Sequence, residues 1–169
     1  MEGKIRTIDN FLDYNSFLNI KNLLLSADFP YYYNSAVASK EDDLDFYFNH
    51  VFYFNNQQQS SWFTEVILPI VEKYGFKKLF RAKCNLYTKK EKQIPTAFHL
   101  DFETPHTVLL YSVNTNNGYT LFKSGEKIFS KENQLIIFNG LLEHCSVSQT
   151  DEKIRVNINI NIEEWLNLQ

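Results

Sequence analysis

The chain lacks the features that mark several large classes of protein. Its 169 residues include only two cysteines, Cys84 and Cys145, and no CxxC motif, so we expect no disulfide framework. The formal net charge of -3 offers no basic surplus, which disfavours nucleic acid as a partner. No segment approaches the roughly 20 consecutive apolar residues that a membrane span needs, and the first residues show no signal-peptide pattern. These absences predict a soluble protein of the reducing cytoplasm with no membrane partner.

What the chain does have is a wealth of aromatic residues, with 15 phenylalanines and 10 tyrosines, and enough length for one sizeable core. No internal repeat divides it. We therefore expect a single domain over residues 1–169, with a helical support over residues 9–75 and a β-rich core over residues 79–162. The sequence leaves the oligomeric state open.

Two helices are expected in the support. Apolar residues recur at helical spacing over residues 9–26, with Asp9 as a capping residue and Pro30 beyond the end. A second apolar helix is expected over residues 60–74, where Pro69 predicts a kink or an early end and Gly75 follows as a stop signal.

Short strands are expected where apolar and aromatic residues lie between turn-forming ones. The segments predicted to be extended are residues 31–35, 46–54, 79–87, 97–102, 106–113, 119–123, 126–129, 134–138 and 153–162. Asn116–Gly118 and Ser124–Glu126 have the composition of hairpin turns, and residues 55–61 that of a surface loop. Helices first and many short strands after favour helices packed on a β-sandwich or an open barrel.

The last predicted strand has the clearest alternation in the chain. Isoleucines and a valine take one face over residues 154–162, while Arg155, Asn157, Asn159 and Asn161 take the other. A fully buried sandwich core would not place four polar residues on one face, whereas a barrel with a polar cavity would. We therefore predict a mainly β fold with flanking N-terminal helices, a double-stranded β-helix (jelly roll).

His99 and Asp101 lie two positions apart in a predicted strand, so they share a face about 6–7 Å apart. Alone, this pair is a weak signal, because a polar pair on a strand is common. His144 follows an apolar strand and a tight turn, and Arg155 follows on the polar face of the next strand. Two imidazoles and one carboxylate form the ligand set of a non-haem Fe(II) site, and a guanidinium can grip a carboxylate at two points.

The histidines and Arg155 also allow other interpretations. His106 could join His99 and Asp101 in a compact cluster, but this choice leaves His144 and Arg155 unexplained. Arg155 could instead form a surface salt bridge with Asp151 or Glu152. His50 lies in an aromatic strand, which favours a structural role.

Residues 79–162 resemble the prolyl-4-hydroxylase-like branch of the 2-oxoglutarate/Fe(II)-dependent dioxygenases. Phe98–Asp101 matches the first metal motif, and Arg81–Tyr87 resembles the strand that supplies a tyrosine to the co-substrate. Leu109–Asn114 and Asn117–Phe122 match the strand pair that lines the co-substrate pocket. Upstream, residues 29–34 and 46–53 resemble small single-domain members from phages and marine bacteria, which extends the expected location to a phage protein acting in the bacterial cytoplasm.

The resemblance implies a role for each residue. His99, Asp101 and His144 would hold Fe(II), and Arg155 would pair with the far carboxylate of 2-oxoglutarate. Tyr87 would assist as a hydrogen-bonding group. Asn85 and Asn159 would point into the cavity beside the co-substrate or the metal, or simply satisfy backbone groups. Collagen-type animal enzymes place a lysine where Arg155 stands, so collagen-like substrates are not inferred.

The implied reaction hydroxylates a prime substrate while 2-oxoglutarate becomes succinate and carbon dioxide, with ascorbate as a candidate reductant. A peptide or a small molecule is the expected substrate, and peptidyl proline is the specific guess by analogy. The charged segment 88–96 and the aromatic segment 31–35 are candidates for selecting it. The rivals are a cupin-like metal-binding or small-molecule-binding jelly roll without oxygenase activity, and a zinc hydrolase, which would lack an obvious general base.

Overall fold

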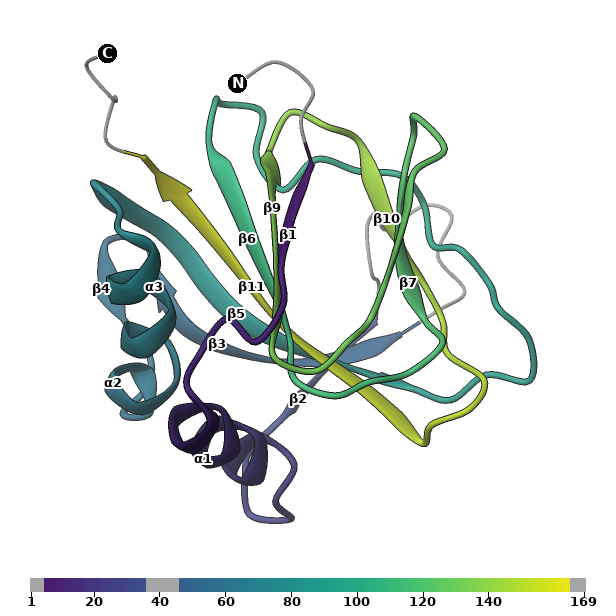
Figure 1. The fold of residues 1–169 in the computed structure, drawn as a ribbon, viewed down its shortest axis with the longest axis horizontal. Helices are drawn as coiled ribbons and strands as arrows, with labels where there is room; N and C mark the ends of the chain where they lie inside the picture. Colours follow the sequence, from purple (N-terminus) through teal and green to yellow (C-terminus); the bar gives the residue numbers. More distant parts are fainter. Residues whose placement is uncertain (1–4, 36–45, 165–169) are drawn as a thin grey trace.

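Two antiparallel sheets form the frame of the molecule in a computed structural model that describes residues 5–35 and 46–164 (Figure 1). The large sheet has the order β1-β9-β6-β11-β5-β3-β2, with β4 paired to β3. Its strands are β1 (Arg6–Ile8), β2 (Tyr32–Asn34), β3 (Tyr47–Phe54), β4 (Gln57–Gln58), β5 (Lys78–Thr88), β6 (Thr107–Ser112), β9 (Gln134–Asn139) and β11 (Ile154–Glu163). Strand β11, whose alternation the sequence predicted, lies at the centre of the sheet, where it pairs with β5 on one side and β6 on the other.

A small sheet faces the large one and has the order β10-β7-β8. Its strands are β7 (Tyr119–Phe122), β8 (Lys127–Phe129) and β10 (His144–Val147). The turn between β7 and β8 contains Gly125 at a φ of +94°, a conformation that suits glycine, as the sequence predicted for a hairpin. Figure 1 shows β7 and β10 on the side of the large sheet opposite the helices.

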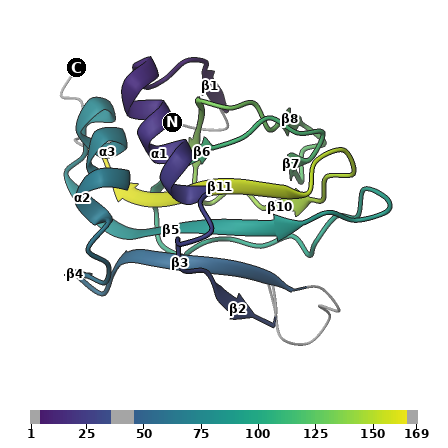
Figure 2. The same cartoon turned by 90° about the horizontal axis from the view of Figure 1, so that it is seen from below.

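Within residues 5–35 and 46–164, three helices pack beside the large sheet (Figure 2). Helix α1 (Tyr14–Leu24) begins later than predicted, because Asp13 rather than Asp9 accepts the capping hydrogen bond, from the backbone N–H of Ser16. Helices α2 (Phe63–Val66) and α3 (Leu68–Tyr74) replace the single predicted helix, since Pro69 stands in the first turn of α3. Within the described residues, no helix is both long and apolar enough to cross a membrane.

The main core lies between these helices and the apolar face of the large sheet. Val156, Ile158 and Ile160 of β11 are at most 1% exposed and belong to the same cluster as the buried residues of α1 and α3, such as Ile20 and Ile70. This burial fixes which face of β11 points inward to the helices. The polar residues of β11 must then face the small sheet.

Some predicted elements differ from the observed ones. Residues 97–102 form no strand, and this stretch is tied to β10 only by an isolated bridge between His99 and His144. Asn116–Gly118 is not a hairpin turn, because it joins β6 of the large sheet to β7 of the small one. The short strands β1, β4 and β10 were not predicted, and each has four residues or fewer.

Candidate metal and co-substrate site

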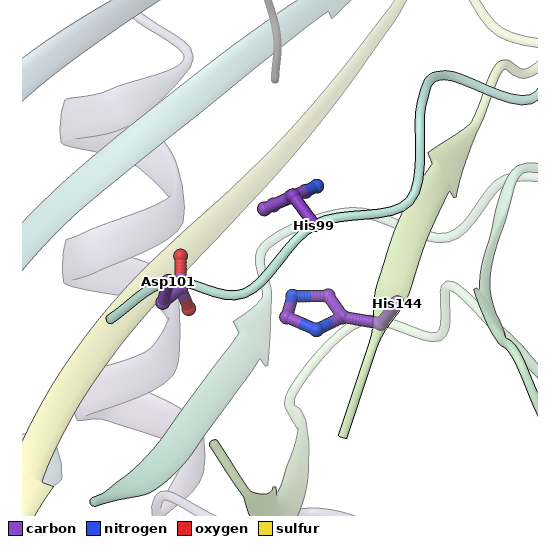
Figure 3. A group of neighbouring side chains, drawn as sticks. All are labelled: His99, Asp101 and His144. Carbon is purple, nitrogen blue, oxygen red and sulfur yellow. The ribbon is translucent and has the colours of Figure 1, made fainter. Parts of the chain in front are cut away.

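His99, Asp101 and His144 form a cluster that could hold a metal ion. One ligand atom from each lies within 4.8 Å of the others. Figure 3 shows that His99 and Asp101 come from the segment between β5 and β6, whereas His144 comes from β10. Reciprocal backbone hydrogen bonds of 3.0 and 3.2 Å join His99 and His144. These bonds bring the two imidazoles together although 97–102 is not a strand.

Asp101 is held by three side chains of the large sheet. Arg81 on β5 donates to Oδ1 at 2.6 Å. Asn159 and Asn161, both on β11, donate to Oδ2 at 2.9 and 3.0 Å. Burial alone would raise the pKa of Asp101, but Arg81 and the two amides outweigh it and hold the pKa well below the ordinary value. The carboxylate is therefore ionised and oriented, as a metal ligand must be.

The backbone fixes the orientation of the His144 ring. The Nδ1 atom lies 2.9 Å from the carbonyl oxygen of Leu142, so a protonated Nδ1 donates there and Nε2 keeps its lone pair. Burial lowers the pKa of His144, although Asp101 opposes this shift. Burial favours the neutral imidazole that binds metals, whereas the hydrogen bond to Leu142 raises the pKa and serves to select the tautomer with its lone pair on Nε2. Two imidazole nitrogens and one carboxylate on one side of an ion suit Fe(II) and leave further positions open.

Arg155 lies in the same pocket as the triad and is 2% exposed. Its Nε donates to Ser130 Oγ at 2.8 Å, and its Nη1 to Ser146 Oγ at 2.6 Å and to the carbonyl oxygen of Val147 at 3.2 Å. No carboxylate of the described residues pairs with it, and its Nη2 donates to none of them. A buried cation without a counter-charge is costly. The pocket thus presents a guanidinium ready to take an anion.

This placement excludes the plainer interpretation of Arg155 as part of a surface salt bridge. Asp151 instead accepts hydrogen bonds from the backbone N–H of Asn117 and Glu152. Gly118 makes room for the arginine, because a Cβ atom there would lie 3.0 Å from Arg155 Cδ. Burial lowers the pKa of Arg155, an effect that Tyr87 opposes.

The other residues singled out in the sequence also line this pocket. The Tyr87 ring centroid lies 5.7 Å from Arg155 Cζ, and burial raises the pKa of its hydroxyl. Asn85 donates to Asn157 Oδ1 at 3.0 Å, while Asn159 binds Asp101. Asn85 Oδ1 and Asn159 Oδ1 are buried without a hydrogen-bond partner. Such acceptors need water or a ligand.

The remaining histidines stand apart from the triad. His106 Nδ1 lies 2.7 Å from the carbonyl oxygen of Thr104, and its ring packs against the backbone of Gly140. His50 is buried between the carbonyl oxygen of Pro30 and Ser60 Oγ, each 2.8 Å from a ring nitrogen, which fits the predicted structural role.

The sequence did not single out Arg81 or assign a role to Asn161. Both lie on polar faces of strands, since Arg81, Lys83, Asn85 and Tyr87 alternate with apolar residues along β5. Arg81 pairs with Asn161 in the strand register, which places both beside Asp101. The alternation along β5 is the signal that could have drawn attention to Arg81.

The segment 88–96 borders the site. Thr88, Lys90, Ile94 and Thr96 line a smaller pocket that also includes Tyr87 and Ser146. Backbone hydrogen bonds tie Lys89 to Lys153 and Lys90 to Gln149. A role of this segment in substrate selection stays a prediction.

No family model and no curated protein matches the sequence. Solved structures do match. An oxidoreductase of the 2OG-Fe(II) oxygenase family from Burkholderia pseudomallei is 12% identical, with a TM-score of 0.69, 96% of this chain covered and 86% of the other. A Trichoplax adhaerens prolyl hydroxylase, in complex with a hypoxia inducible factor peptide fragment, is 10% identical, with a TM-score of 0.63 and coverages of 96% and 84%.

A third match is the epimerase SnoN in complex with Fe³⁺, α-ketoglutarate and nogalamycin RO. It is 13% identical, with a TM-score of 0.62, 94% of this chain covered and 78% of the other. At sequence identities this low, the similarity shows the fold alone. The chain has the double-stranded β-helix of the 2-oxoglutarate/Fe(II) oxygenases, which confirms the predicted fold class.

Proposed function

We propose that the protein is an Fe(II)- and 2-oxoglutarate-dependent dioxygenase that hydroxylates a prime substrate and releases succinate and carbon dioxide. One observation carries the proposal. A single pocket holds both a His-Asp-His triad and a buried arginine that lacks a counter-charge among the described residues. The oxygenase fold supports the proposal without naming the reaction.

Fe(II), when bound by His99, Asp101 and His144, would supply the activation of oxygen that amino-acid side chains cannot provide. The protein supplies the positions of the metal ligands. Arg81 and the amides of β11 hold the Asp101 carboxylate, and the carbonyl oxygen of Leu142 fixes the His144 ring.

Arg155 would bind the far carboxylate of 2-oxoglutarate. Its Nε and Nη1 are held by Ser130, Ser146 and Val147, so the guanidinium is oriented before the ligand arrives. Tyr87 lies beside it and would contribute a hydrogen bond, while Asn85 and Asn159 would line the cavity near the co-substrate and the metal. A cupin-like domain without oxygenase activity has no need of this arginine.

The prime substrate is proposed only as a class, a peptide or a small molecule. Peptidyl proline is the candidate by analogy, since one similar structure is a prolyl hydroxylase with a bound peptide and another is an epimerase. Ascorbate as reductant, a single domain and a cytoplasmic location stay predictions.

The test is anaerobic reconstitution with Fe(II) and 2-oxoglutarate, followed by oxygen and measurement of succinate. We expect slow succinate formation by the wild type, and none above background for His99→Ala or Arg155→Ala. Calorimetry of 2-oxoglutarate binding to the Zn(II) form gives a second measurement, which Arg155→Ala should abolish. Lys153→Ala, an exposed change just before β11, is the matched control and should behave as wild type. A wild type that binds neither the metal nor 2-oxoglutarate refutes the proposal.

A further inference from the structure

Lys83 is the second cation of the pocket, and its surroundings differ from those of Arg155. It lies on β5 and lines the pocket together with the triad. Its side chain contacts Tyr47, whose hydroxyl oxygen is 3.4 Å from Nζ and whose ring centroid is 5.5 Å away. Among the described residues, no carboxylate pairs with Lys83.

Two amides join this lysine around the same oxygen; they do not line the pocket themselves but adjoin it through Tyr47, which does. Asn34 Nδ2 lies 3.4 Å and Asn49 Nδ2 3.2 Å from the hydroxyl of Tyr47. Three donors therefore converge on one phenol oxygen at the long end of hydrogen-bond distances or beyond it. The hydroxyl of Tyr47 itself donates to no acceptor among the described residues. Three nitrogen donors, one of them charged, thus gather around one oxygen, as donors do at an anion site.

The position of Lys83 separates it from the co-substrate anchor. In the strand register Arg155 pairs with Tyr87, whereas Lys83 pairs with Asn159, the residue that donates to Asp101. The two cations are thus four residues apart along paired strands, about 13 Å. Lys83 stands at the metal end of the pocket and Arg155 at the other. The near carboxylate of the co-substrate would bind the metal and its far carboxylate would bind Arg155. Both of its charges would then have a partner without Lys83.

Aromatic rings connect the two ends. Tyr47 and Tyr87 are stacked at 5.7 Å between centroids, with Lys83 near the first ring and Arg155 near the second. Each cation therefore lies against a different ring of the same stack.

We propose that Lys83, Asn34 and Asn49 recognise a carboxylate of the prime substrate and so make it an acidic molecule or an acidic peptide side chain. The single positive charge of Lys83 matches a monoanion, and the neutral amides add hydrogen bonds without further charge. This inference rests on the proposed function, because the pocket receives a prime substrate only if the protein is an oxygenase.

The test is a titration followed by nuclear magnetic resonance of the ¹⁵N-labelled full chain. Zn(II) and N-oxalylglycine, an inert analogue of 2-oxoglutarate, first fill the metal and Arg155 positions. Sodium acetate is then the probe, at constant ionic strength, with acetamide as its uncharged counterpart. We expect acetate to shift the side-chain amide signals of Asn34 and Asn49 in a saturable way, and acetamide to leave them unmoved.

The variants make the result specific. Lys83→Gln should weaken acetate binding by about tenfold or more, while N-oxalylglycine binding stays within about twofold of wild type. Lys127→Gln is the matched control, since Lys127 also lies over a tyrosine ring, 5.2 Å from the centroid of Tyr119, but lines no part of the pocket. It should bind acetate as the wild type does.

Three outcomes would overturn the inference. These are acetate leaving the amides unshifted, Lys83→Gln binding acetate as the wild type does, and inorganic phosphate binding about tenfold more tightly, which would assign the site to a phosphate group. If Zn(II) and N-oxalylglycine themselves fail to bind, the proposed function fails, and the inference fails with it. If both bind and only the acetate titration fails, the proposed function stands.

Discussion

The two ends of the pocket each bury a charged side chain, but only one of them is neutralised by the fold. Asp101 has a side-chain exposure of 5% and lies 2.6 Å from Arg81. Arg155 is buried as deeply, yet its described partners are two hydroxyls and one carbonyl oxygen. The same strand, β11, supplies residues to both ends, through Asn159 and Asn161 at one and Arg155 at the other.

This difference means that Asp101 is ready to bind a metal ion, whereas Arg155 is ready to bind an anion. Asp101 is ionised and fixed before a metal arrives, because Arg81 and the amides offset the cost of burying its charge. For Arg155 the unfavourable free energy of burying its charge is not offset by a carboxylate of the described residues, and an incoming carboxylate would offset it. We therefore expect the metal end to contribute to the stability of the free protein and the Arg155 end to contribute to ligand binding.

The largest expected effect comes from breaking the neutralised end. Arg81→Met leaves the Asp101 carboxylate buried without its cation, which should lower the free energy of unfolding by about 3 kcal/mol. Urea denaturation of the metal-free protein measures this change. Adding Asp101→Asn in the same chain removes the charge and should reduce the loss to about 1 kcal/mol. If the single and double variants lose the same unfolding free energy, the ion pair with Asp101 is not the reason why Arg81 stabilises the protein.

The opposite end should respond differently to the same kind of change. Arg155→Met removes a buried charge together with its three hydrogen bonds, so the unfolding free energy of the metal-free protein should change by no more than about 1 kcal/mol. The wild type, loaded with Zn(II) and 2-oxoglutarate at a hundred times its dissociation constant, should gain about 2.7 kcal/mol from the co-substrate. The variant should gain nothing, as measured by urea denaturation with and without 2-oxoglutarate. A loss of several kcal/mol in the free variant would contradict the comparison.

The sequence predicted the two ends unequally, for physical reasons. The alternation of β11 placed Arg155 and its asparagines on one face, because side chains of a strand alternate whatever their neighbours are. Arg81 escaped notice because its partner Asp101 lies 20 residues away, and their contact depends on how the segment after β5 folds back. A single sequence does not reveal that path.

The same limit explains the errors in secondary structure. Residues 97–102 alternate like a strand, but they find only isolated backbone partners on β10, so they remain irregular. Asn116–Gly118 has a hairpin composition, yet Asn116 donates to the carbonyl oxygen of Asn114 and its Oδ1 accepts from Gly118, within a connection between sheets. Strands and helices with strong periodicity were predicted well, whereas connections that depend on distant partners were not.

The smallest expected effect comes from a change that displaces Arg155 without removing its charge. In Gly118→Ala the new Cβ would lie 2.9 Å from Asn116 Oδ1 and 3.0 Å from both Arg155 Cδ and the carbonyl oxygen of Val147. The backbone oxygen is fixed, so the side chains of Asn116 and Arg155 must both give way, and the hydrogen bond from Arg155 to Ser146 would lengthen. We expect 2-oxoglutarate to bind about tenfold more weakly, a cost of about 1.4 kcal/mol, in calorimetry of the Zn(II) form. Zn(II) affinity should stay unchanged, because Gly118 lines none of the metal end. A parallel loss of metal affinity would mean that the two ends move together and are not independent parts of one pocket.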